Sequence, residues 1–227
     1  GVSILSQDGL TPAEQLTRIH AAASELITRQ QKQWRSLRAA LGLVLQRAVV
    51  PGRGVDHVIE SEADRGRYLV TQSKVAFALL DGYEATGDTR YLAAANDIAA
   101  FVLQTMKRGE EAAYRDHLAI GAEFGLLDMP LLPMQDNARF ARVLVRLAAL
   151  GALEDGRSTA EGILGNYAGD LAVRGVRALE PALAIDELLS DPLVVTLEGP
   201  AGDQRTQALR RAALLARFPG LDTRRVW

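Results

Sequence analysis

The residue types best suited to acid–base chemistry in this 227-residue chain gather between positions 114 and 137. Four carboxylates in this stretch could supply an acid and a base to a glycosidic bond or a sugar carbon, because such reactions use paired carboxyl groups. These carboxylates are Asp116, Glu123, Asp128 and Asp136. The polar side chains that would orient or contact the ligand are Tyr114, His117, Gln135 and Asn137. The stretch is therefore the candidate site for a glycosidase-like or epimerase-like enzyme.

An ordinary helix cap is the competing interpretation of part of this stretch. Asp136 and Asn137 come just before Ala138 and an apolar helical pattern. Asp and Asn at such positions commonly accept hydrogen bonds from the first N–H groups of a helix. The cap is the favoured role at these two positions. Because sequence spacing does not give the separation of the carboxylates, the enzyme hypothesis stays open as an alternative.

Composition excludes several other kinds of chemistry. The chain has no cysteine, which excludes thiol redox chemistry, disulfides and cysteine-ligated zinc. Its three histidines, His20, His57 and His117, lie in separate segments without metal-ligand spacing, so neither a metal nor another cofactor is expected. A formal net charge of -2 provides no general attraction for nucleic acid. No apolar run approaches the roughly 18 residues that a membrane span needs.

The elements that position these residues are expected to be helices joined in pairs. Hydrophobic residues make up 48% of the chain and aromatics only 5%, which indicates a core of Ala, Leu and Val between closely packed helices. A helix is predicted from about residue 12 to residue 48, followed by a loop over residues 53–67. Helices over residues 69–85 and 89–106 are joined by Thr86-Gly87-Asp88. So short a link predicts an antiparallel hairpin in which Gly87 ends one helix and Asp88 caps the next.

A second hairpin of the same kind is predicted downstream. Its helices cover residues 135–150 and 158–173, with a break near residues 151–156. Three residues of the first unit recur in the second: Gln72, Phe77 and Ala78 correspond to Gln135, Phe140 and Ala141. A period near 65 residues indicates stacked or ring-arranged helical hairpins, and with two units a chance match is the alternative.

The C-terminal region has a different character. Residues 192–197 are rich in β-branched side chains and predict a strand, residues 204–218 predict a helix, and residues 225–227 are expected to pair beside the strand. The fold class is therefore mainly α, built from antiparallel helical hairpins with a small C-terminal β element. A single helical-hairpin domain is expected over residues 1–227, with residues 190–227 as a small α/β appendage.

Four segments together resemble the C-terminal helical, six-hairpin glycosidase-like part of the thioredoxin-domain proteins of the spermatogenesis-associated type. They are GLTPAEQLTRIHAAASELITRQ, ALLDGYEATGDTRYLAAANDIAAFV, LLPMQDNARFARVLVRLAALG and DPLVVTLEGPAGDQRTQALRRA, in the family's order. The resemblance implies part of an (α/α) toroid, which a thioredoxin domain precedes in the family. Where the family's polar run closes in Trp-Asn-Gly, residues 70–74 of this chain read VTQSK. This departure favours a divergent member and puts an inherited ligand site in doubt.

Two functional hypotheses follow from the sequence. The leading one is a non-redox helical binding or scaffolding module without an active site of its own, and the alternative is the carbohydrate-processing enzyme. A carbohydrate or another protein domain is the candidate partner, and an incomplete toroid could also complete itself as a homo-oligomer. Nucleic acid and a membrane span are not expected. Residues 1–9 lack a basic and apolar leader pattern; the compartment stays open, with the cytoplasm as the default.

Overall fold

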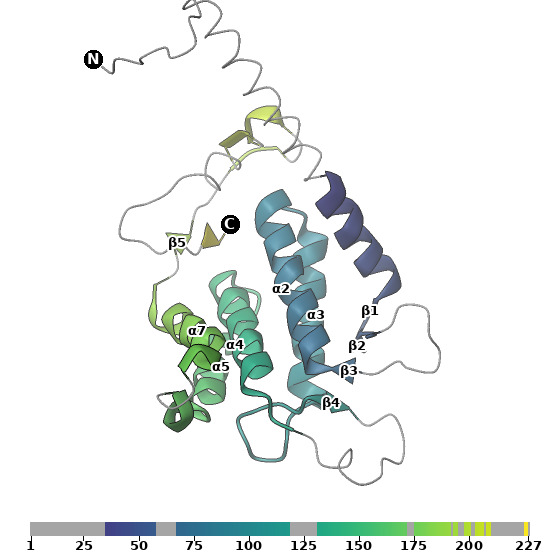
Figure 1. Ribbon diagram of the computed structural model, residues 1–227. Coiled ribbons are helices and arrows are strands. Elements are labelled where there is room, and N and C mark those ends of the chain that lie inside the picture. The colour runs from purple at the N-terminus through teal and green to yellow at the C-terminus, as the bar shows by residue number, and fades with distance from the viewer. Residues whose placement is uncertain are drawn as a thin grey trace, which may run out of the picture. The chain divides into compact units, whose positions relative to one another are not determined.

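The fold was analysed on a computed structural model of the chain. It describes residues 35–57, 67–118, 131–171, 175–191, 193–194, 198–200, 203–206, 208–209 and 225–226. The chain divides into two units, Gly1–Gly42 and Leu43–Trp227. Residues 35–47 are helical, as predicted, whereas the predicted part of this helix before residue 35 lies outside the described residues. The named helices and strands, which Figure 1 labels where there is room, belong to the second unit.

The second unit is mainly helical, as the sequence predicts. Its named α-helices are α2 (Leu69–Thr86), α3 (Thr89–Thr105), α4 (Met134–Ala149), α5 (Gly156–Gly165) and α7 (Leu179–Leu189). Two 3-10 turns are η2 (Ala168–Asp170) and η3 (Gly175–Ala178). The two-residue strands are β1 (Val49–Val50), β2 (Gly54–Val55), β3 (Arg67–Tyr68), β4 (His117–Leu118), β5 (Leu193–Val194) and β6 (Arg225–Val226). Within the described residues, no helix combines the length and the apolar character that crossing a membrane requires.

Helices α2 and α3 form the predicted antiparallel hairpin. Gly87 ends α2 at a φ of 71°, and its N–H donates to the Tyr83 carbonyl at 2.7 Å. Glycine adopts this left-handed conformation without strain. The Asp88 carboxylate then accepts a hydrogen bond of 3.1 Å from the Arg90 N–H and so caps α3. The two helices are in contact, which confirms the hairpin (Figure 1).

Helices α4 and α5 form the second hairpin. A Cβ at Gly156, the first residue of α5, would lie 2.5 Å from the Leu144 carbonyl oxygen. Only glycine permits this close an approach between the two helices. The prediction of a helix over residues 158–173 is wrong in part, because α5 ends at Gly165 and the 3-10 turn η2 follows.

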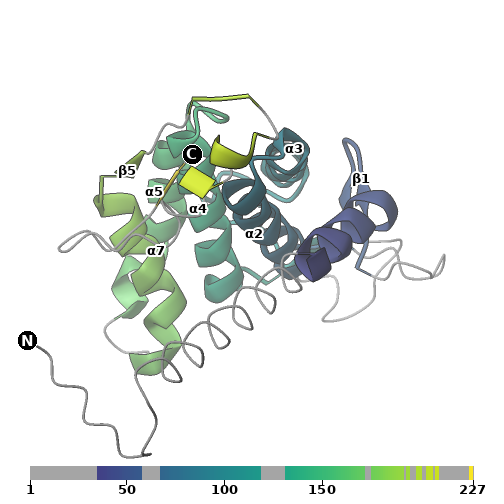
Figure 2. The same cartoon turned by 90° about the horizontal axis from the view of Figure 1, so that it is seen from above.

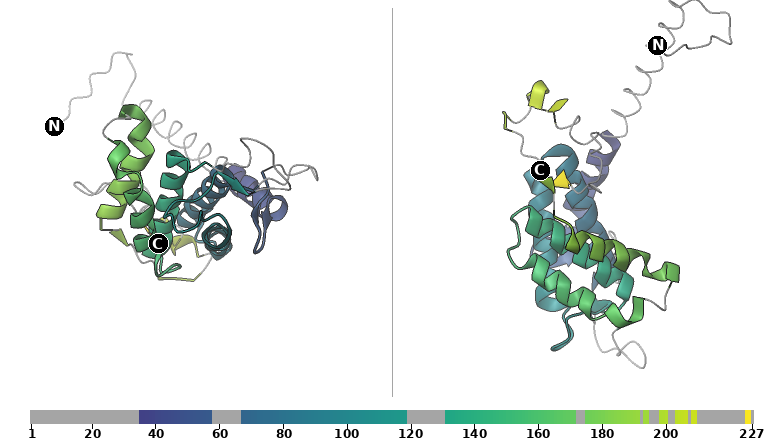
Figure 3. Two further views of the ribbon diagram at one scale, coloured as in Figure 1. Left: turned by 90° about the horizontal axis from the view of Figure 1, so that it is seen from below. Right: turned by 90° about the vertical axis from the view of Figure 1, so that its left-hand side faces the viewer.

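Helices α2, α4 and α7 lie side by side. Helix α4 contacts α2 on one flank and α7 on another, while α3 packs on α2 and α5 packs on α4 (Figures 2 and 3). The interior between them is mostly aliphatic. Its fully buried side chains include Leu79, Leu80, Ile98, Val102, Phe140, Leu144 and Ile163.

Helix α7 and the turn η3 have no counterpart in the sequence prediction, which assigned no element between residues 174 and 191. Pro181 lies in the first turn of α7, where its missing N–H breaks no intrahelical bond. The helix buries Pro181, Ala184 and Glu187 but exposes several leucines. Apolar residues on both sides weaken the periodic signal by which an amphipathic helix is found in sequence.

The strands form three two-stranded pairs at different places in the second unit. Strands β1 and β2 are antiparallel, β3 and β4 are antiparallel with Tyr68 opposite His117, and β5 and β6 are parallel with Leu193 opposite Arg225. The last pairing confirms the predicted terminal sheet. The predicted loop over residues 53–67 is wrong where β2 begins at Gly54 and β3 begins at Arg67. Two-residue strands are too short to show an alternating pattern.

Candidate functional site

Two buried side-chain amides anchor the connections that lead into α2 and α4. Asn137 accepts a hydrogen bond from the Tyr114 N–H at 2.8 Å and donates to the Tyr114 carbonyl at 2.9 Å. Its Nδ2 also donates to the Pro133 carbonyl at 3.0 Å. The side chain is fully buried. Asn137 therefore holds the backbone of a residue 23 positions earlier in place, and we call this arrangement the Asn137 clamp.

Gln72 makes the same arrangement at the start of α2. It accepts from the Val55 N–H at 2.8 Å and donates to the Val55 carbonyl at 2.7 Å, and it is also fully buried. Gln72 and Asn137 are each the fourth residue of their helix. The predicted pairing of Gln72 with Gln135 is therefore displaced by two residues, since Gln135 is exposed and Asn137 occupies the equivalent position.

Neither Asp136 nor Asn137 caps its helix, so the prediction of an N-cap at these positions is wrong. Helix α4 begins at Met134 and its N-cap is Pro133, which has no side-chain hydrogen bond to offer. Asp136 is thus the third helical residue, where a carboxylate still interacts favourably with the helix dipole. The helix starts one residue earlier than predicted because the fixed φ of Pro133 suits the position before a helix.

Tyr114 supports the second hairpin from inside. Its ring is 4% exposed and packs edge-on against the Phe140 ring, with 5.2 Å between centroids. Burial raises the pKa of the Tyr114 phenol. Since the Asn137 clamp occupies its backbone and Phe140 covers its ring, this tyrosine is placed to pack.

Asp116 and His117 lie on the connection between the two hairpins. The Asp116 Oδ1 atom lies 2.9 Å from His117 Nδ1 and accepts a hydrogen bond of 3.0 Å from the Leu131 N–H. The backbone of Asp116 accepts from the Leu69 N–H at 2.8 Å. This aspartate therefore ties the β4 segment both to the first residue of α2 and to the segment that enters α4.

Three aromatic rings from separate segments meet beside this aspartate. The Tyr68 ring lies 4.8 Å from the His57 ring and 6.1 Å from the His117 ring, measured between centroids. His57 Nδ1 also lies 2.6 Å from Thr71 Oγ1. The convergence of His57 and Tyr68 on His117 was not predicted, because β-strand pairing brings them together from distant positions. No group of metal-ligating side chains is found among the described residues.

Asp136 is the second described carboxylate of the candidate site. Burial raises its pKa, the charges of Arg139 and Lys74 lower it, and the negative charges of Asp116 and Glu180 raise it. Asp136 is therefore close enough to Asp116 for the two carboxylates to repel each other. Arg139 Nη1 lies 3.5 Å from the Asp136 Oδ1 atom.

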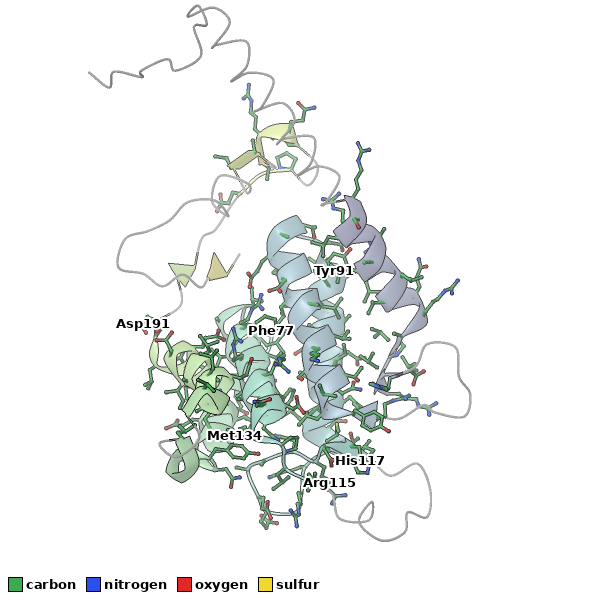
Figure 4. All side chains as sticks on the ribbon, viewed as in Figure 1. Phe77, Tyr91, Arg115, His117, Met134 and Asp191 are labelled. Carbon is green, nitrogen blue, oxygen red and sulfur yellow. The ribbon has the colours of Figure 1, made fainter. Side chains whose placement is uncertain are left out.

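The structure thus brings together part of the predicted site. Asp116 contacts His117, and its charge raises the pKa of Asp136; Figure 4 labels His117 beside Arg115 at the end of the hairpins where α4 begins at Met134. Glu123 and Asp128 lie outside the described residues.

A charged face on α4 was missed by the sequence analysis. Arg139, Arg142 and Arg146 recur at intervals of three and four residues, which places them along one side of the helix. The two ion pairs between Arg142 and α7 reach Glu180 at 2.8 Å and Glu187 at 2.7 Å. We call these three arginines with their carboxylate partners the arginine ladder. Their spacing in the sequence was the available signal.

The arginine ladder also joins α4 to α2. Arg146 pairs with Glu84 at 2.6 Å and with Asp81 at 2.8 Å. The guanidinium groups of Arg142 and Arg146 lie 4.7 and 4.6 Å from the centroid of the Phe77 ring, which Figure 4 labels between the helices. Cations at this distance are attracted to the face of an aromatic ring.

Burial sets the protonation of this face. Burial raises the pKa of Glu84, while the neighbouring Arg146 lowers it. The Arg146 side chain is only 9% exposed, so its charge is weakly screened by solvent. Each arginine of the ladder has carboxylate partners on a neighbouring helix, and the face therefore fixes how α2, α4 and α7 lie against one another.

Comparison with protein-family models, with curated proteins and with solved structures finds no match for this chain.

Proposed function

We propose that this chain is a non-redox helical binding or scaffolding module, resembling part of a six-hairpin toroid, with no catalytic activity of its own. The observation that carries the proposal is the Asn137 clamp. Asn137 is one of the candidate ligand-binding residues, yet its amide is used to hold Tyr114 and Pro133. Asp116 likewise holds the segment entering α4. Polar groups that a catalytic site would direct at a substrate here join segments of the protein.

The arrangement of the helices supports the toroid part of the proposal. In such folds, inner helices contact one another in sequence and each carries an outer helix. Helices α2 and α4 fit the inner role because each carries a following helix, α3 or α5, on one side. Helix α7 continues the inner row through its contact with α4. A module of this kind acts by presenting a rigid surface to a carbohydrate or to another protein domain.

The test is an assay of the full chain against a panel of aryl glycosides and sugar epimerisation substrates, run beside calorimetric titration with soluble oligosaccharides. The proposal expects no turnover above the buffer rate. Turnover that disappears in Asp136→Asn but survives in Asp155→Asn would overturn it. Asp155 is a suitable control because it is exposed and lies in the link before α5.

A carbohydrate-processing enzyme is the second candidate, and one observation favours it. Asp136 has a raised pKa beside the second carboxylate Asp116, and His117 lies against Asp116. A carboxyl group with a raised pKa can serve as a general acid beside a second carboxyl group. In that case Asp136 would donate the proton and Asp116 would act as the base. The rate would then fall as the pH rises through the pKa of Asp136, and a flat pH profile would argue against this role.

A further inference from the structure

We draw no further inference here: the strongest candidate, the Arg115 side chain on the connection between the two hairpins, carries nothing because its buried Nε atom, although it has no hydrogen-bond partner among the described residues, is closed to solvent, so that no ligand can reach it without a rearrangement that nothing in the described structure indicates.

Discussion

The two hairpins α2–α3 and α4–α5 are built on one plan but are stabilised differently. In both, the fourth residue of the first helix is a buried amide that clamps an earlier backbone segment. The α2–α3 link is two residues with an aspartate cap, whereas the α4–α5 link is six residues and Asp155 makes no cap bond. The arginines lie on α4 and their partner carboxylates lie on α2 and α7. The two hairpins thus share the buried amide that anchors each of them. The ion pairs, by contrast, join α4 specifically to α2 and α7.

The largest expected effect comes from removing a clamp. Asn137→Leu leaves the buried N–H and carbonyl of Tyr114 without their partners, and each unsatisfied group costs about 1–3 kcal/mol. The free energy of unfolding should fall by about 2–5 kcal/mol in urea titration. Gln72→Leu should lower it by a similar amount through Val55. A loss below about 1 kcal/mol in either variant would show that the clamps are not equivalent anchors.

The close approach within α4–α5 gives the next effect. Gly156→Ala places a methyl group 2.5 Å from the Leu144 carbonyl oxygen, so the helices must separate. Overpacking of this kind costs about 1–3 kcal/mol in the free energy of unfolding. Gly162→Ala is the control, because its nearest neighbour would be Ala112 Cβ at an ordinary 3.6 Å. Thermal unfolding should show the control unchanged or more stable; equal losses in both would contradict the close approach.

Removing one arginine of the ladder should change stability in a pH-dependent way. Arg146→Met leaves Glu84 without the charge that lowers its pKa, so the raised pKa rises further. A folded-state pKa above the unfolded value means that stability is lost as pH rises through it. The variant should therefore lose about 1–2 kcal/mol at pH 7, which corresponds to about one pKa unit, and recover part of it toward pH 5.

Denaturant titrations at both pH values measure this effect. Arg90→Met is the control, since the Arg90 side chain is 77% exposed beside Asp88. A loss that does not change between pH 5 and pH 7 would remove Glu84 from the explanation.

The smallest effect distinguishes the two hairpin links. Asp88→Ala removes the bond to the Arg90 N–H and should cost about 1 kcal/mol, the usual value of an N-cap. Asp155→Ala should change stability by less than about 0.5 kcal/mol, because its side chain makes no cap bond. Calorimetric melting of the two variants makes the comparison, and equal shifts would show that α5 is capped after all.

Sequence analysis succeeded where the determining interaction is local. Gly87 ends α2 through its left-handed backbone, and Asp88 starts α3 through its side-chain cap. Both signals are local, so both helices were predicted to within a residue. The repeat was also visible, although its register was two residues out. Matching residue types in the sequence selected Gln135 as the counterpart of Gln72, whereas burial and hydrogen bonding in the structure identify Asn137.

Interactions between distant segments were not predictable in the same way. A clamp is a contact between a side chain and the backbone of a residue 17 or 23 positions away, and backbone groups have no sequence signature. The arginine ladder showed its spacing, but its partners Glu84 and Glu187 lie on other helices. Of the predicted site, Asp116 comes to the segment that enters α4, and so influences Asp136, because its backbone N–H and its carboxylate bond to Leu131. Only the tertiary fold supplies that proximity.

The two clamps also bear on how such a chain can evolve. Gln72 bonds to a residue 17 positions earlier and Asn137 to a residue 23 positions earlier, yet each is the fourth residue of its helix. Loop-closure entropy grows slowly with length, by about 0.6 kcal/mol for each doubling. Insertions and deletions between the clamped residue, Val55 or Tyr114, and the helix that follows it can therefore accumulate without moving the helices. These intervals are the places where a new binding loop could be grafted onto an unchanged scaffold.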